Sequence, residues 1–149
     1  MHKQIYIYLN LFLNFAFSNV YMKKDIQSRE DIKLLIDMFY DKILVNPLLQ
    51  PIFIDIAHID LKHHLPILYD FWSYVLLGEM GYNRNVMEPH IRLNQKITLT
   101  QEHFDEWMRL FTETVDEYFE GTKAGEAKSR AKTNALLMQH KIKFMPKIE

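Results

Sequence analysis

The chain of 149 residues contains no cysteine. This absence excludes disulfide bonds, iron–sulfur clusters held by thiolates and Cys-type zinc sites. Any metal must therefore be held by histidine, carboxylate or tyrosine side chains. The histidines are His2, His58, His63, His64, His90, His103 and His140.

The chain also has no excess of basic residues, since 18 Lys and Arg stand against 19 Asp and Glu. Without a basic field to attract phosphate groups, nucleic acid is not an expected partner. Apolar residues make up 48% of the chain and charged residues 25%, as in an ordinary soluble domain. Aromatic residues are frequent at 13%, which suits a dense core or a flat apolar ligand.

Common catalytic motifs are missing as well. The sequence has no HExxH, no Glu-x-x-His, no GxSxG, no Walker loop and no GxGxxG. It therefore lacks the spacing of zinc proteases, ferritin-like di-iron sites, serine hydrolases, P-loop proteins and dinucleotide-binding domains. Two Asp-x-x-His pairs, at 55–58 and 60–63, are weak metal motifs around a loop.

Residues 1–21 differ from the rest, because they are strongly apolar and Lys3 is their one Lys, Arg, Asp or Glu residue. Asn10 and Asn14 interrupt a run that is already short for a membrane-spanning helix. The basic start and the 16–18 triplet loosely resemble a signal peptide. We favour the interpretation that Met22 is the natural start. We expect a cytoplasmic protein, with export left open, and a single domain over residues 22–149.

Helical spacing of apolar residues begins after Ser28, which stands three residues before Asp31 as in a capping box. We expect this first helix to stop at Asn46-Pro47. Residues 48–53 form a short apolar connection. A second helix is predicted from near Asp60 to about Leu77.

Pro66 inside this second helix predicts either a kink or a later start of its regular part, and Gly78 ends it. The next predicted piece, residues 86–93, has only one or two turns. Thr100 then caps a long helix closed by Gly121. The last helix is predicted from about residue 125 to 140. It carries a row of small residues, Ala127, Ala131 and Ala135, that allows a close helix neighbour. Strand patterns are absent, so we expect an all-α fold.

The short predicted helix carries His90, which follows a proline and has Val86, Met87 and Leu93 as apolar neighbours. A haem iron takes a neutral imidazole on one side of the porphyrin, and His90 has the setting for it. The alternative is an ordinary surface histidine. The other side of such a site needs hydrogen-bond donors in an apolar pocket. Tyr40 and Trp107 offer one each, and core packing is the alternative for both.

Taken together, these segments resemble the group III truncated haemoglobins. The matching strings, which span residues 22–140, are Phe39-Tyr40, Asn46 to Phe53, His64-Leu65-Pro66, Phe71-Trp72, Leu76-Leu77-Gly78, Tyr82-Asn83, Met87 with His90 and Leu93, His103-Phe104 with Trp107, Leu110-Phe111, Thr114-Val115-Asp116 and Arg130-Ala131. The resemblance implies a truncated globin fold in which two helix pairs cross around haem. Arg84 departs from the family, which often has glycine after Tyr-Asn, so the turn before His90 stays open.

The resemblance also implies a role for each site residue. It makes His90 the proximal ligand of haem b. It places Tyr40, His64, Leu68 and Trp107 on the distal side. Phe53 would lie against the porphyrin edge, with Trp72 and Leu93 completing the pocket.

Three functions follow as hypotheses. The first is binding of O₂ or another diatomic gas such as NO or CO, with Tyr40 and Trp107 as donors. The second is haem-dependent detoxification of nitric oxide or peroxide. This would require a separate reductase, because the chain has no flavin or nicotinamide domain. The third is a haem-free helical interaction module. No membrane contact is expected for the globin domain.

Overall fold

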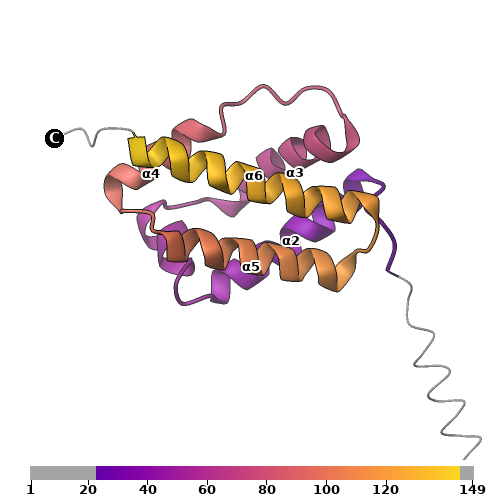
Figure 1. The fold of residues 1–149 in the computed structure, drawn as a ribbon, viewed down its shortest axis with the longest axis horizontal. Helices are drawn as coiled ribbons and strands as arrows, with labels where there is room; N and C mark the ends of the chain where they lie inside the picture. The colour runs from indigo at the N-terminus through magenta and orange to yellow at the C-terminus, as the bar shows by residue number, and fades with distance from the viewer. Residues whose placement is uncertain (1–22, 145–149) are drawn as a thin grey trace, which may run out of the picture.

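The computed structural model describes residues 23–144, which form helices joined by loops (Figure 1). The elements are α2 (Arg29–Val45), the π-helical turn η1 (Pro51–Ile56), α3 (Leu61–Leu77), α4 (Met87–Lys96), α5 (Gln101–Tyr118) and α6 (Thr122–Phe144). No strand occurs between residues 23 and 144, so the all-α prediction is confirmed. The apolar extension 1–21 lies outside the described residues, and the domain boundary at residue 22 stays a prediction.

The helices form two pairs that cross in two layers. In Figure 1, α5 and α6 run across the front and α2 and α3 lie behind them. The closest packing joins α5 to α6, α2 to α3 and α2 to α5. The short α4 packs on α6. This is the predicted arrangement of helix pair on helix pair.

The start of α2 follows from its sequence. The Ser28 hydroxyl accepts a hydrogen bond from the Asp31 backbone N–H at 3.3 Å, and the Asp31 carboxylate accepts from the Ser28 backbone N–H at 3.0 Å. This reciprocal capping box satisfies backbone groups that the first turn leaves free. The buried apolar face of α2 consists of Ile32, Leu35, Ile36, Phe39, Tyr40 and Ile43.

Small residues bring α6 close to its neighbours. Ala127 and Ala131 are completely buried and Ala135 is nearly so, as the spacing predicts. With so little side chain between them, the backbones of α5 and α6 approach closely. None of the described helices combines the length and apolar character needed to cross a bilayer.

Several boundaries differ from the prediction. The connection at 48–53 includes a π-helical turn that runs to Ile56. Helix α4 has ten residues, so the prediction of one or two turns is wrong. Helix α6 starts at Thr122 and runs to Phe144, beyond the predicted bounds at both ends. Pro66 lies inside α3, which begins at Leu61, so the later start is wrong.

A close approach of two chain segments fixes the start of α6. Gly121 has a φ of +143°, and the Asp25 carboxylate accepts hydrogen bonds from the backbone N–H groups of Lys123 and Ala124 at 2.9 and 2.8 Å. A Cβ on Gly121 would lie 2.4 Å from Cγ of Asp25. Only glycine provides both the backbone conformation and the space.

Gly121→Ala is therefore expected to lower the free energy of unfolding by about 2 to 4 kcal/mol, through backbone strain and overpacking. Urea unfolding followed by circular dichroism measures it. Gly125→Ala is the matched control, because Gly125 lies inside α6 and a Cβ there meets nothing within 4 Å. This control should raise stability by about 0.5 to 1 kcal/mol. Equal effects at the two glycines would contradict the close-approach argument.

Candidate haem site

His90 lies on α4 with one ring nitrogen already engaged. Its Nδ1 is 2.8 Å from the backbone carbonyl oxygen of Val86. A carbonyl can only accept, so Nδ1 carries the proton and, in the neutral ring, Nε2 keeps its lone pair. Burial lowers the pKa of His90, which favours the neutral form, while the bond to Val86 acts in the opposite direction. The imidazole is thus held in the tautomer that binds a metal through Nε2.

The start of α4 is held by Asn85, which precedes the helix. Its side-chain oxygen accepts from the backbone N–H groups of Met87 and Glu88 at 3.0 and 3.4 Å. Arg84 is exposed and has no positive φ, so this turn needs no glycine. The departure at Arg84 therefore leaves the helix that carries His90 intact.

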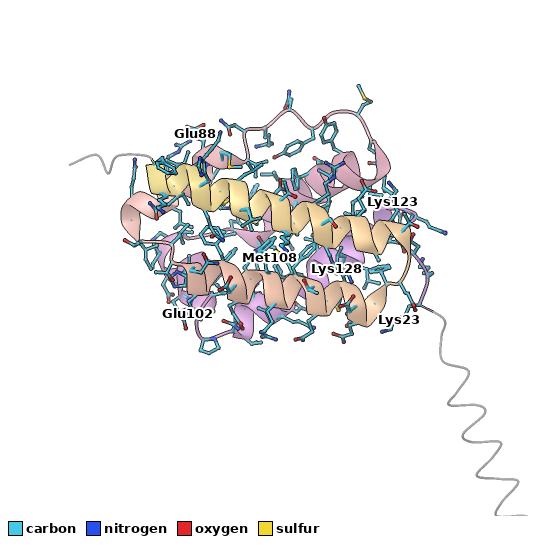
Figure 2. All side chains as sticks on the ribbon, viewed as in Figure 1. Lys23, Glu88, Glu102, Met108, Lys123 and Lys128 are labelled. Atoms are coloured by element: carbon cyan, nitrogen blue, oxygen red, sulfur yellow. The ribbon has the colours of Figure 1, made fainter. Side chains whose placement is uncertain are left out.

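Helix α4 has a polar outer side and a partly apolar inner side. Glu88, at the periphery of the molecule in Figure 2, forms an ion pair with Arg92 at 2.7 Å. His90 and Leu93 are half-buried, and Leu93 packs against the core. Among the described helices, α4 alone has no fully buried residue. Helix α4 therefore contributes less to the core than the other described helices do.

Tyr40 and His64 form a polar pair on the neighbouring helices α2 and α3. The Tyr40 hydroxyl oxygen and His64 Nε2 are 2.7 Å apart, and their ring centroids are 5.5 Å apart. Burial raises the pKa of Tyr40 above its usual value, so the phenol keeps its proton at neutral pH. The site thus contains a buried hydroxyl donor beside an imidazole.

The charge of His90 affects the pKa of His64 although their helices α4 and α3 do not pack closely. Burial lowers the pKa of His64 first, and the neighbouring His90 lowers it further. Helix α3 packs on α2 and α6, whereas α4 packs on α6. Two imidazoles that favour their neutral forms therefore belong to α3 and α4, two helices that pack little against each other. This placement suits a ligand held between α3 and α4.

One aromatic ring borders the polar pair, and two further predicted site residues pack against the core. Phe53 on η1 lies edge-on to Tyr40 with ring centroids 5.8 Å apart. Trp107 on α5 and Leu68 on α3 are half-buried and pack against the core. Tyr40, Phe53, Trp107 and Leu68 belong to four different elements, and all four belong to or pack against one core cluster.

Trp72 has a different position. It is 4% exposed and stacks on Phe111 at 4.9 Å. Its surroundings are those of a core residue, next to the site rather than beside Tyr40 and His64. Its predicted place in the pocket stays a prediction.

Hollows elsewhere on the surface do not involve these residues. One, of about 440 Å³, lies between the ends of α4, α5 and α6. Another, of about 640 Å³, lies where α2, α3 and α6 meet. Residues 23–144 also contain no cluster of three or more His, Asp or Glu side chains fit to hold a metal. The candidate site is therefore identified by the chemistry of its donor groups, and His90 is the residue that would hold a metal there.

Comparisons with known proteins identify the family of the chain. The chain is 33% identical over 98 residues to the group 3 truncated hemoglobin ctb of Campylobacter jejuni, covering 64% of this chain and 75% of that protein. The chain belongs to the group III truncated haemoglobins. The crystal structure of a group III truncated hemoglobin from Campylobacter jejuni superposes with a TM-score of 0.72 and 27% identity, covering 81% of this chain and 95% of that one. No family model matches the chain.

In this truncated haemoglobin the structure brings together residues that lie far apart in the sequence. Tyr40 contacts both His64 and Phe53, and His90 lowers the pKa of His64 through its charge. The exposed His63 is set apart from them and pairs with Asp60. The carbonyl of Val86 is a feature that the sequence analysis missed. A backbone carbonyl is present at every residue, so no residue type in the sequence marks this acceptor. The signal that could have found it is the position of Val86 one helical turn before His90.

Proposed function

We propose that this chain binds haem b through His90 and reversibly binds O₂ or another diatomic gas beside Tyr40. The observation that carries the proposal is the hydrogen bond from His90 Nδ1 to the Val86 carbonyl, which leaves Nε2 free. Membership of a haemoglobin family supports haem as the ligand. Ferrous haem, when bound, supplies an iron with an open coordination position for O₂, NO or CO.

The residues of the chain would orient and select the ligand. His90 would fix the group on one side, and the half-buried Leu68, Leu93 and Phe53 would exclude water from its faces. The hydroxyl of Tyr40 and the indole N–H of Trp107 would donate hydrogen bonds toward a polarised diatomic ligand. A hydrogen bond in an apolar pocket is stronger than the same bond in water. We therefore expect slow release of the bound gas.

Reconstitution with haem tests the proposal. Purified protein titrated with haem should reach an equimolar endpoint with an intense Soret band, and the reduced form should give a CO difference spectrum. A protein that is helical by circular dichroism but stays colourless would overturn the proposal and favour a haem-free module.

Detoxification of nitric oxide or peroxide is a second candidate. The adjacency of Tyr40 and His64 favours it, because polar groups around a bound oxygen ligand assist O–O chemistry. Such turnover would draw electrons from a separate reductase. Stopped-flow mixing of the O₂-loaded protein with nitric oxide should give rapid oxidation of the ferrous haem. Absence of this oxidation would count against nitric oxide detoxification.

A further inference from the structure

The aromatic rings of α5, α3 and the α3–α4 loop form one continuous series of contacts. Consecutive centroids are 5.4 Å apart for Trp107–Phe111, 4.9 Å for Phe111–Trp72, 5.4 Å for Trp72–Phe71, 5.2 Å for Phe71–Tyr82 and 6.2 Å for Tyr82–Tyr74. The series begins at a candidate distal residue and ends at Tyr74, which is 48% exposed. Trp107 also lies edge-on to Phe39, which lies edge-on to Tyr40. The series therefore leads from the neighbourhood of Tyr40 to the surface.

Core packing accounts for only part of this series. Phe111 and Trp72 are buried, and their stacking contributes to the core between α3 and α5. Tyr82 and Tyr74 lie outside that core, and their rings stack at an interplanar angle of 29°. A tyrosine pair at the surface adds little to core stability, yet it extends the series to solvent.

The order of residue types in the series suits electron transfer. Tryptophan and tyrosine are the aromatic residues that lose one electron most readily, whereas phenylalanine resists oxidation. Trp107, Trp72 and Tyr82 alternate with Phe111 and Phe71, so each oxidisable ring is one phenylalanine away from the next. A buried tryptophan followed by a half-buried and then an exposed tyrosine gives a path of increasing solvent access.

We propose that the series from Trp107 to Tyr74 carries oxidising equivalents from the haem pocket to the surface when peroxide reacts there. The proposal rests on the proposed function, because haem is the group at which peroxide would be reduced. Electrons move inward, from Tyr74 and Tyr82 through Trp72 to the pocket. The series would thereby move an oxidising equivalent out of the haem pocket. It would end as a tyrosyl radical at the surface, where a small reductant can reach it.

The overall reaction balances with a low-molecular-weight reductant of the ascorbate or phenol class. Hydrogen peroxide takes up two electrons and two protons and gives two water molecules. Each electron that leaves Tyr82 or Tyr74 is accompanied by loss of the phenol proton to water. Two molecules of reductant then each return one hydrogen atom to a tyrosyl radical at the surface.

Spin trapping on the haem-loaded protein tests the proposal. After addition of equimolar hydrogen peroxide and a nitroso spin trap, peptide mass spectrometry should find the adduct on Tyr82 and Tyr74. In Tyr82→Phe the adduct on Tyr74 should be lost, and the Soret band should bleach faster because the oxidising equivalent stays inside. In Trp72→Phe both tyrosine adducts should be lost. Before peroxide is added, the Soret and CO spectra of Tyr82→Phe should match those of the wild type.

Tyr118→Phe is the matched control, since Tyr118 is a half-buried tyrosine of α5 outside the series. It should leave the Tyr74 adduct unchanged. Equal adducts on Tyr74 with and without the Tyr82 hydroxyl, or labelling of Tyr118 to the same extent, would overturn the relay. A normal Soret band with unlabelled tyrosines removes this inference alone, whereas absence of the Soret band removes the proposed function and the relay with it.

Discussion

His90→Gly is expected to lose most of its haem affinity, by more than about 100-fold, since changes behind a metal ligand alone cost about 10- to 100-fold. The substitution removes the imidazole whose Nε2 is kept free by the hydrogen bond from Nδ1 to Val86. It leaves the apolar side chains of the pocket in place. The rate of haem transfer to an apo-globin acceptor measures the loss, and the Soret band of the remaining complex should shift.

Free imidazole should restore the spectrum of His90→Gly, because the space left by the side chain accepts a detached ligand. His63→Ala is the control, since His63 is 81% exposed and binds Asp60 instead of the site. That variant should keep the wild-type spectrum. An unshifted Soret band in His90→Gly, or a loss of haem in His63→Ala of similar size, would show that another residue is the axial ligand.

Residues with strong local preferences made most helices predictable. Ser28 and Asp31 form their capping box, Asp60 caps α3 by accepting from the Lys62 N–H, and Gly78 ends α3 with a φ of +71°. These interactions involve residues within a few positions of one another, so the sequence alone specifies them. The predicted all-α fold with two crossing helix pairs follows from such elements.

The helix boundaries that were predicted wrongly lie where contacts between distant residues, or rare backbone forms, determine the ends of the helix. The π-helical turn at Pro51–Ile56 is a rare backbone form with no reliable local pattern. The start of α6 at Thr122 depends on Asp25, almost a hundred residues earlier, which accepts from the Lys123 and Ala124 N–H groups. No window of sequence contains both partners, so a local analysis places the start too late.

The candidate site was predictable only in its residue types. His90 has a recognisable setting, Tyr40 and Trp107 are candidate donors by residue type, and the resemblance to a family supplied His64, Leu68 and Phe53. The bond between Tyr40 and His64 joins α2 to α3, and His90 on α4 lowers the pKa of His64 on α3. Such pairings require the tertiary fold. The aromatic series shows the same limit, because its rings come from residues 71 to 111.

Tyr40→Phe is expected to raise the O₂ dissociation rate of the haem-loaded protein by about 10- to 100-fold. A hydrogen bond to a partly charged ligand contributes about 1.5 to 3 kcal/mol, and each 1.4 kcal/mol corresponds to a factor of ten. Phenylalanine keeps the ring that packs against Phe39 and Phe53, so the change isolates the hydroxyl. Displacement of O₂ by CO in a stopped-flow instrument measures the rate.

His64→Leu is expected to change the O₂ dissociation rate in the opposite direction to Tyr40→Phe, because His64 contacts Tyr40. A phenol has one proton to donate, and at 2.7 Å from His64 Nε2 that proton can be engaged by the imidazole instead of the ligand. Removing the imidazole releases the Tyr40 hydroxyl, so O₂ dissociation should stay the same or slow. In the double variant the rate should return to that of Tyr40→Phe. If Tyr40→Phe alone leaves the rate unchanged, Tyr40 is not the distal donor, and Trp107 is the remaining candidate.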